Sequence, residues 1–174
     1  MAISTDDYAR MAADSYKSWP DGHAVDGTDF EVYKTLQNTT SGYYGAIYRN
    51  KITGELVVAH RGTEFDDNGT GTDILRDLVE ADGQMALQRI NQQIDDARHL
   101  VEIALDLAKH SSPSGGPVSV TVTGHSLGGS LAQVTAFEYG LYGETFNAYG
   151  AAGQYGTPAG GSQGGFKVHA QHNQ

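Results

Sequence analysis

The sequence contains no cysteine, which excludes disulfide bonds, thiolate nucleophiles and zinc sites built from cysteine. It has no apolar run near the length of about 20 residues that a helix needs to span a bilayer. The first residues, 1–7, show neither a basic region nor an apolar run, so they do not resemble a secretory signal peptide. We therefore expect a soluble chain that stays in the cytoplasm or is exported by a dedicated secretion system.

Positive charge is also scarce. The chain has 11 Lys and Arg against 21 Asp and Glu, a formal net charge of -10. Nucleic-acid binding needs clustered basic side chains to neutralise phosphates, so no nucleic acid is expected as a partner. The same balance disfavours electrostatic docking on anionic membranes, but it permits transient contact of apolar side chains with a neutral lipid surface.

The remaining composition is that of a globular domain. The chain has 174 residues, of which 39% are hydrophobic and 18% charged, enough for a single domain (1–174) with its own core. It has 23 glycines, and residues 150–165 are expected to form a Gly-rich loop. No cofactor and no metal site are expected.

Hydrophobic periodicity predicts an alternation of strands and helices. Three short strands come first and read as an antiparallel meander. Apolar residues from Leu87 to Ala108 then step by three and four, as in an amphipathic helix. The expected elements are a helix capped by Ser4 or Thr5 and stopped by 19–22, strands 30–36, 43–49 and 55–61, helix 87–108, strand 118–123, helix 127–139, strand 144–149 and a last strand from 166.

This order predicts an α/β fold. A strand, a long helix, a strand, a helix and a strand form right-handed, parallel βαβαβ units. The prediction is a mostly parallel sheet with antiparallel N-terminal strands and helices on both faces.

One turn of this fold carries a chemical motif. A strand of β-branched residues runs into Gly124-His125-Ser126-Leu127-Gly128, which is followed by a helix of small residues. This is the context of a nucleophile elbow, in which glycines flank the serine because a Cβ would not fit. Ser126 is the expected nucleophile, and the Leu127 N–H, at the positive end of the helix, is an expected oxyanion donor. The alternative is a structural turn that happens to hold a serine.

A second motif ends the third strand. The apolar residues 57–59 lead into His60-Arg61-Gly62-Thr63. Thr63 can offer both its N–H and its hydroxyl to the same oxyanion. The alternative is that Gly62 and Thr63 only terminate the strand.

These motifs together resemble the class 3 (fungal-type) lipase family of α/β-hydrolases. The resemblance rests on 57–63, on Asp77 within 74–78, on 124–129 and on 146–150, and it covers roughly residues 43–150. One departure is Gly150-Ala151-Ala152-Gly153, where the family has a small residue and a proline. A looser resemblance, to lipase domains of bacterial secreted effectors, rests on the missing signal peptide and the Gly-rich tail.

The resemblance implies hydrolysis of carboxylic esters of a lipid or phospholipid through an acyl-enzyme on Ser126. It also implies Thr63 as an oxyanion donor and a mobile lid over 64–78. The same residues are compatible with an acyltransferase.

The partners of the serine are not evident. A Ser nucleophile needs a general base and an acid that orients it, and in this family an Asp and then a His follow the Ser. The residues after Ser126 contain no Asp, and Glu138 and Glu144 are not placed to serve. We therefore expect an incomplete α/β-hydrolase, with its Asp and His on a missing C-terminal segment or a second chain. The alternative is a catalytically silent lipase-like module that binds a partner or a lipid.

The histidines have other expected roles. His60 is predicted to be a hydrogen-bonded core residue, and His125 to point away from the face that carries the nucleophile. His169 and His172 are interpreted as parts of a polar, frayed C-terminus rather than as the base.

Overall fold

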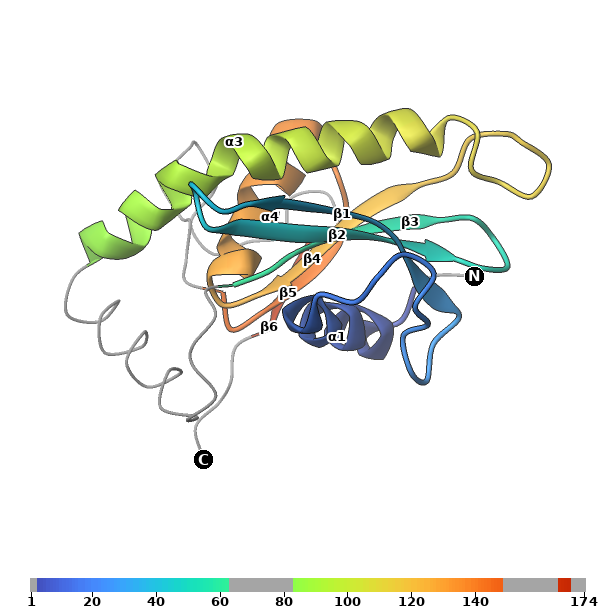
Figure 1. Ribbon diagram of the computed structural model, residues 1–174, viewed down its shortest axis with the longest axis horizontal. Coiled ribbons are helices and arrows are strands. Elements are labelled where there is room, and N and C mark those ends of the chain that lie inside the picture. The colour runs from blue at the N-terminus through green and yellow to red at the C-terminus, as the bar shows by residue number, and fades with distance from the viewer. Residues whose placement is uncertain (1–2, 63–82, 149–165, 170–174) are drawn as a thin grey trace.

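A computed structural model describes residues 3–62, 83–148 and 166–169 (Figure 1). Within these ranges the strands form one six-stranded sheet in which the spatial order equals the chain order. The elements are α1 (Thr5–Asp14), η1 (Ser15–Lys17), β1 (Phe30–Asn38), β2 (Tyr43–Asn50), β3 (Leu56–His60), α3 (Gly83–Ala108), β4 (Val120–His125), α4 (Leu127–Tyr139), β5 (Gly143–Phe146) and β6 (Lys167–His169).

The sheet is mixed, as the sequence predicts. The pairs β1–β2 and β2–β3 are antiparallel, whereas β3–β4, β4–β5 and β5–β6 are parallel. Every residue of β3 is buried, because helices cover both faces of the sheet at this strand. The predicted fold class is therefore confirmed.

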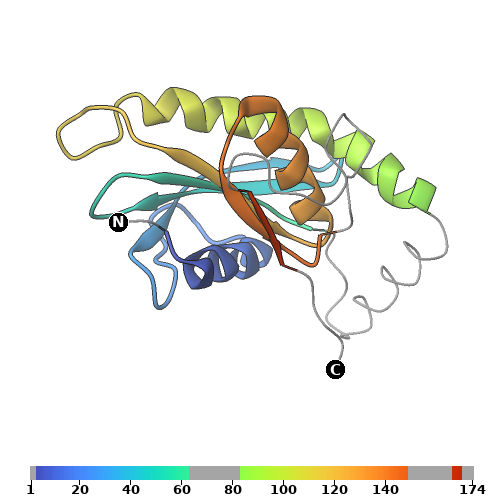
Figure 2. The ribbon, with the colours of Figure 1, turned by 180° about the vertical axis from the view of Figure 1, so that it is seen from behind.

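The molecule has three layers. Helices α3 and α4 lie on one face of the sheet and α1 on the other, which the two opposite views make plain (Figures 1 and 2). The larger apolar core lies under α3 and α4, and its α3 members repeat at the predicted spacing: Ile90, Ile94, Ala97, Val101, Ala104 and Ala108. A smaller core, which includes Tyr8, Met11 and Tyr48, fills the space between α1 and the sheet. No helix of the described ranges is both long and apolar enough to cross a membrane.

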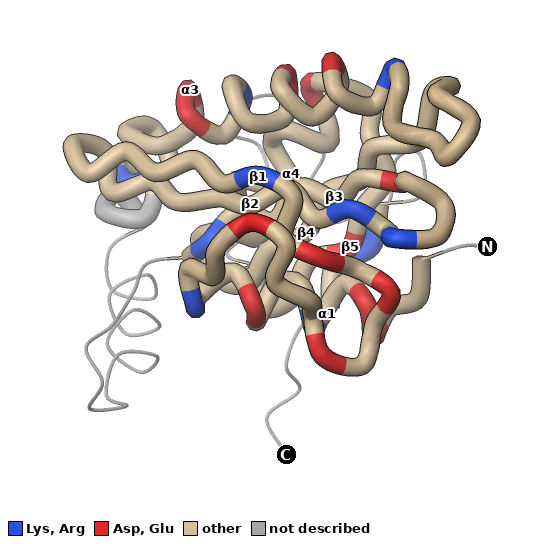
Figure 3. The backbone as a smooth tube through the Cα atoms, turned by 45° about the vertical axis from the view of Figure 1, so that its right-hand side comes forward, with Lys and Arg blue, Asp and Glu red and all other residues tan. Residues whose placement is uncertain are grey.

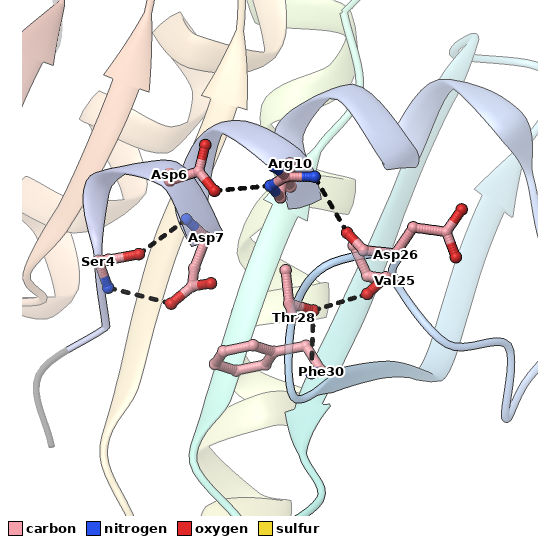
Figure 4. A network of polar contacts seen from close by, with 8 residues as sticks. All are labelled: Ser4, Asp6, Asp7, Arg10, Val25, Asp26, Thr28 and Phe30. Carbon is pink, nitrogen blue, oxygen red and sulfur yellow. Dashed lines mark hydrogen bonds and ion pairs between the residues drawn. The ribbon is translucent and has the colours of Figure 1, made fainter.

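Helix α1 begins at a capping box (Figure 4). The Ser4 hydroxyl accepts from the Asp7 N–H at 3.1 Å, and the Asp7 carboxylate accepts from the Ser4 N–H at 3.2 Å. Arg10 pairs with Asp6 and donates to the Asp26 carbonyl at 3.3 Å, which ties the helix to the loop after it. Acidic residues are prominent in the backbone tube along α1 and this loop (Figure 3).

The end of α1 was predicted wrongly. The helix stops at Asp14, several residues before the Trp19–Gly22 stretch that we expected to end it. The chain tightens into η1 and then turns at Ser18, whose φ is 51°. This left-handed residue redirects the backbone directly after η1, which lies at the edge of the sheet where β3 and β4 end.

The ends of the two strands beside Ser126 also shift. Strand β4 runs to His125 rather than to Thr123, so only one residue separates it from α4. Strand β5 ends at Phe146 rather than at residue 149, because Asn147 has a φ of 49° and leaves the extended conformation.

His60 is a hydrogen-bonded core residue, as predicted. Its side chain is fully buried, with Nδ1 2.7 Å from the Tyr43 hydroxyl and Nε2 3.2 Å from the Thr135 hydroxyl. Burial lowers the pKa of His60 to about 3, because the imidazolium form is not solvated in this core.

This pKa predicts acid lability. Between the unfolded value, 6.5, and the folded value, about 3, only the unfolded state binds the proton, so stability falls as pH falls through this window. At pH 5 the loss relative to neutral pH should be about 2 kcal/mol from this group. The check is the free energy of urea unfolding from pH 7 to pH 5 for the parent and for His60→Gln. Between pH 7 and pH 5 the unfolding free energy of the variant should fall less than that of the parent. An equal fall in both proteins would contradict the lowered pKa of His60.

Candidate active site

Ser126 is the single residue between β4 and α4, and its backbone is strained. It has φ 58° and ψ -125°, a combination that a residue with a Cβ rarely adopts. Such a conformation costs about 1–3 kcal/mol and persists only where surrounding structure enforces it. The side chain lies at the C-terminal edge of the parallel strands, where ligands bind in α/β folds, and it is 8% exposed.

The glycines around Ser126 are required by close backbone contacts. A Cβ on Gly124 would overlap the Gly128 carbonyl, and a Cβ on Gly128 would overlap the His60 carbonyl. The Gly128 Cβ would also lie 2.8 Å from the Arg61 carbonyl carbon and from the Gly62 nitrogen. The turn is therefore wedged against the end of β3, and glycine is the residue that fits.

The N-terminus of α4 opens at the same edge. No side chain caps this helix end. The first N–H groups of a helix have no partner within the helix, and they carry its partial positive charge. The Leu127 N–H is the first of them, so this edge can stabilise an oxyanion next to the Ser126 hydroxyl.

The end of β3 lies beside this turn. Arg61 is 9% exposed; its guanidinium lies 4.3 Å from the centroid of the Tyr44 ring and donates to the Ser18 hydroxyl at 2.8 Å. Gly62 faces the His125 carbonyl, because a Cβ at Gly62 would be 2.9 Å from it. The structure thus brings the two sequence motifs together up to Gly62, and Thr63 is the first residue after that described range.

Backbone strain is concentrated at this edge. Among the described residues other than glycine, three have a positive φ: Ser18, Ser126 and Asn147. Ser18 contacts Arg61 after β3, Ser126 follows β4, and Asn147 follows β5. Left-handed residues that gather at one place mark a site where geometry has been kept despite its energetic cost.

His125 points to the α1 face of the sheet, away from α4, as predicted. Its Nδ1 is 3.1 Å from the Tyr16 hydroxyl, and its Nε2 is 3.5 Å from the Asn147 side-chain nitrogen. Burial lowers the pKa of His125, which favours the neutral ring. The sequence does not indicate Tyr16 as part of the site. Asn147 lies in the 146–150 motif, and its one further signal is that Asn tolerates a left-handed backbone.

The interpretation of His169 as a frayed residue was wrong. It lies in β6, its Nε2 is 2.8 Å from the Glu144 carboxylate, and its ring stacks on Phe146 with centroids 5.0 Å apart. Glu144 is 1% exposed. Burial by itself raises the pKa of Glu144, but the hydrogen bonds to His169 and Thr5 and the nearby charge of Lys167 outweigh it, so the pKa is lowered. His169 is thus engaged with Glu144 on the α1 face.

Several predicted features lie outside the described residues. They are Thr63, the lid over 64–78 with Asp77, the Gly-rich loop 150–165, and His172. Within 3–62, 83–148 and 166–169, no three His, Asp or Glu side chains are grouped so that they could hold a metal ion.

Comparisons with known proteins identify the family and the fold. The family model described as a Tle-like phospholipase domain matches residues 7–157. The Penicillium rubens protein named lipase atg15 is 27% identical over 169 residues, covering 81% of this chain and 25% of that protein.

Solved lipases share the fold. The lipase from Rhizopus microsporus var. chinensis superposes with a TM-score of 0.52 at 24% identity, over 81% of this chain and 55% of the other. The Rhizomucor miehei lipase in its propeptide complex gives a TM-score of 0.55 at 19% identity, over 85% and 55%. The chain therefore has the fungal lipase-like α/β-hydrolase fold, and it spans little more than half of these lipases and a quarter of the Penicillium protein.

Proposed function

Because the chain belongs to the Tle-like phospholipase domain family, we propose that it is the Ser-bearing part of a lipid esterase that cleaves a carboxylic ester through an acyl-enzyme. The observation that carries this proposal is the conformation of Ser126. A serine held at φ 58° between a buried parallel strand and an uncapped helix has its hydroxyl next to free N–H donors.

The proposed reaction begins with attack on the ester. The Ser126 Oγ bonds to the carbonyl carbon while its proton passes to a general base. The Leu127 N–H and, as proposed from the family resemblance, Thr63 stabilise the oxyanion. Collapse of the tetrahedral intermediate expels the alcohol, which takes the proton from the base, and water then hydrolyses the acyl-enzyme.

The general base and its orienting acid are proposed to lie in sequence that is not part of these 174 residues. Two observations support this. The chain covers about half of the lipases that share its fold, and no Asp follows Ser126 in it. His169, the last described histidine in the chain, is bonded to Glu144 on the α1 face.

The substrate is proposed to be a phospholipid or a neutral glyceride. The family description names phospholipases, and the similar structures are of lipases. The net charge of -10 favours a neutral or zwitterionic head group over an anionic one, because anionic head groups would be repelled.

The test is labelling by a fluorophosphonate, read by intact mass, with Ser126→Ala as the control. It should be run on this chain and on the longer natural protein, if one exists, that contains it. We expect a single adduct that disappears in Ser126→Ala, with a faster reaction in the longer protein. No adduct in either would contradict the proposal and favour the alternative of a non-catalytic lipid-binding module.

A further inference from the structure

The peptide unit that precedes Ser126 is hydrogen-bonded at both ends. The Ser126 N–H donates to the Phe146 carbonyl at 3.0 Å. The carbonyl of the same unit, that of His125, accepts from the Tyr16 hydroxyl at 3.4 Å. These contacts come from β5 on one side and η1 on the other, and they oppose rotation of the unit. Because φ of Ser126 is the rotation about the bond next to this unit, fixing the unit helps to fix the strained conformation.

The His125 side chain belongs to the same set of contacts. Its Nδ1 lies 3.1 Å from the Tyr16 hydroxyl, and its Nε2 lies 3.5 Å from Nδ2 of Asn147. A neutral imidazole has one donor and one acceptor nitrogen. The Asn147 amide nitrogen is a donor, so Nε2 is the acceptor and Nδ1 carries the proton. The Tyr16 oxygen then accepts from Nδ1 and donates its own proton to the His125 carbonyl.

When His125 carries its proton on Nδ1, every donor in this chain of contacts has an acceptor. The sequence is Asn147 N–H to Nε2, Nδ1–H to the Tyr16 oxygen, and the Tyr16 O–H to the His125 carbonyl. The other neutral tautomer would place Nε2–H against the Asn147 amide hydrogens.

Tyr16 also reaches the second motif. A Cβ on Gly62 would overlap the Tyr16 hydroxyl, so this hydroxyl lies between Gly62, after β3, and His125, before Ser126. Next to it, Ser18 accepts from Arg61. Residues 15–18 therefore contact the ends of β3 and β4, the two strands that carry the sequence motifs.

We propose that Tyr16, His125 and Asn147 form a hydrogen-bonded chain that positions Ser126 for reaction, with His125 held neutral and protonated on Nδ1. None of the three is a catalytic residue; they act through the peptide unit before the serine. The part that concerns reactivity rests on the proposed function, whereas the part that concerns the tautomer and the peptide unit does not.

The first test is spectroscopic. Imidazole ¹⁵N shifts should show His125 as the neutral Nδ1–H tautomer at pH 7, assigned by the loss of its signals in His125→Gln. In Asn147→Gly and in Tyr16→Phe this preference should weaken or reverse, and hydrogen exchange of the Ser126 amide should accelerate. An Nε2–H tautomer in the parent, or unchanged exchange in both variants, would overturn the proposal even if Ser126 proved unreactive.

The second test is the rate of fluorophosphonate labelling of Ser126. Tyr16→Phe keeps the ring and removes the hydroxyl, together with its contacts to Nδ1 and to the carbonyl of His125. We expect the rate to fall by about tenfold or more, since even one net hydrogen bond changes a barrier by about that factor. Asn147→Gly relieves a left-handed residue, so the fold should not weaken while the rate still falls. That combination separates positioning from a merely structural role.

The matched control is Tyr48→Phe. Tyr48 is buried on the same face and donates to Asp14 of α1 at 2.8 Å, so the variant also loses one tyrosine hydrogen bond. Its labelling rate should equal that of the parent. Equal losses of rate in Tyr48→Phe and Tyr16→Phe would show a general effect of destabilisation and would refute the positioning role.

Discussion

Replacing Ser126 with glycine is expected to abolish labelling and, at the same time, to make the protein more stable than Ser126→Ala. Both variants lack the hydroxyl, and loss of a serine nucleophile lowers turnover by a factor on the order of 10⁴ or more. They differ in the backbone. Alanine keeps the Cβ that makes φ 58° unfavourable, whereas glycine adopts this φ without strain.

The expected difference in unfolding free energy is about 1 kcal/mol in favour of glycine. Relief of strain contributes about 1–3 kcal/mol, and the greater freedom of glycine in the unfolded chain offsets about 0.5–1 kcal/mol of it. Urea unfolding of the two variants measures this difference. Ser114→Gly is the control, because Ser114 is exposed and its φ is not positive, so glycine there should destabilise slightly. A Ser126→Gly protein less stable than Ser126→Ala would mean that the backbone is not strained at this position.

Replacing Gly128 with alanine is expected to be strongly disruptive. The new Cβ would overlap the His60 carbonyl and approach the backbone of Arg61 and Gly62, none of which can rotate away as a side chain would. Either α4 moves off the sheet or the end of β3 is displaced. We expect a loss of about 3 kcal/mol or more, at the upper end of overpacking effects, and loss of labelling at Ser126.

Thermal unfolding and labelling of Gly128→Ala provide the measurement. Gly116→Ala serves as the control, since its φ is not positive and the nearest atom to its Cβ would be the Ser112 hydroxyl at 3.3 Å. That variant should stay within about 0.5 kcal/mol of the parent. A Gly128→Ala protein with the same unfolding midpoint as the parent would contradict the close backbone contact between the start of α4 and the end of β3.

Local pattern was sufficient to predict most of the fold. The spacing of apolar residues from Leu87 to Ala108 reports one buried face, and that face does pack on the sheet. The burial of His60 followed from its place in an apolar strand. The conformation at Ser126 could be anticipated because the glycines that permit it are adjacent in sequence.

Local sequence pattern did not predict the features that depend on contacts between residues far apart in the chain. Tyr16 and His125 are 109 residues apart, and nothing in the local sequence of either indicates the other. Asn147 ends β5 early by adopting a positive φ, although the residues around it have strand propensity. His169 looked frayed because its partner, the buried Glu144, lies on a different strand.

The strand order, which follows the chain order from β1 to β6, has a consequence for biosynthesis. As the polypeptide emerges from the ribosome, each new strand finds its neighbour already made, and the sheet can grow in one direction without waiting for later insertions. The turn at Ser126 differs, because its N–H is bonded only once Phe146 has been synthesised. The nascent chain therefore holds strands β1 to β4 before the turn at Ser126 is fixed, and β6 is added after it.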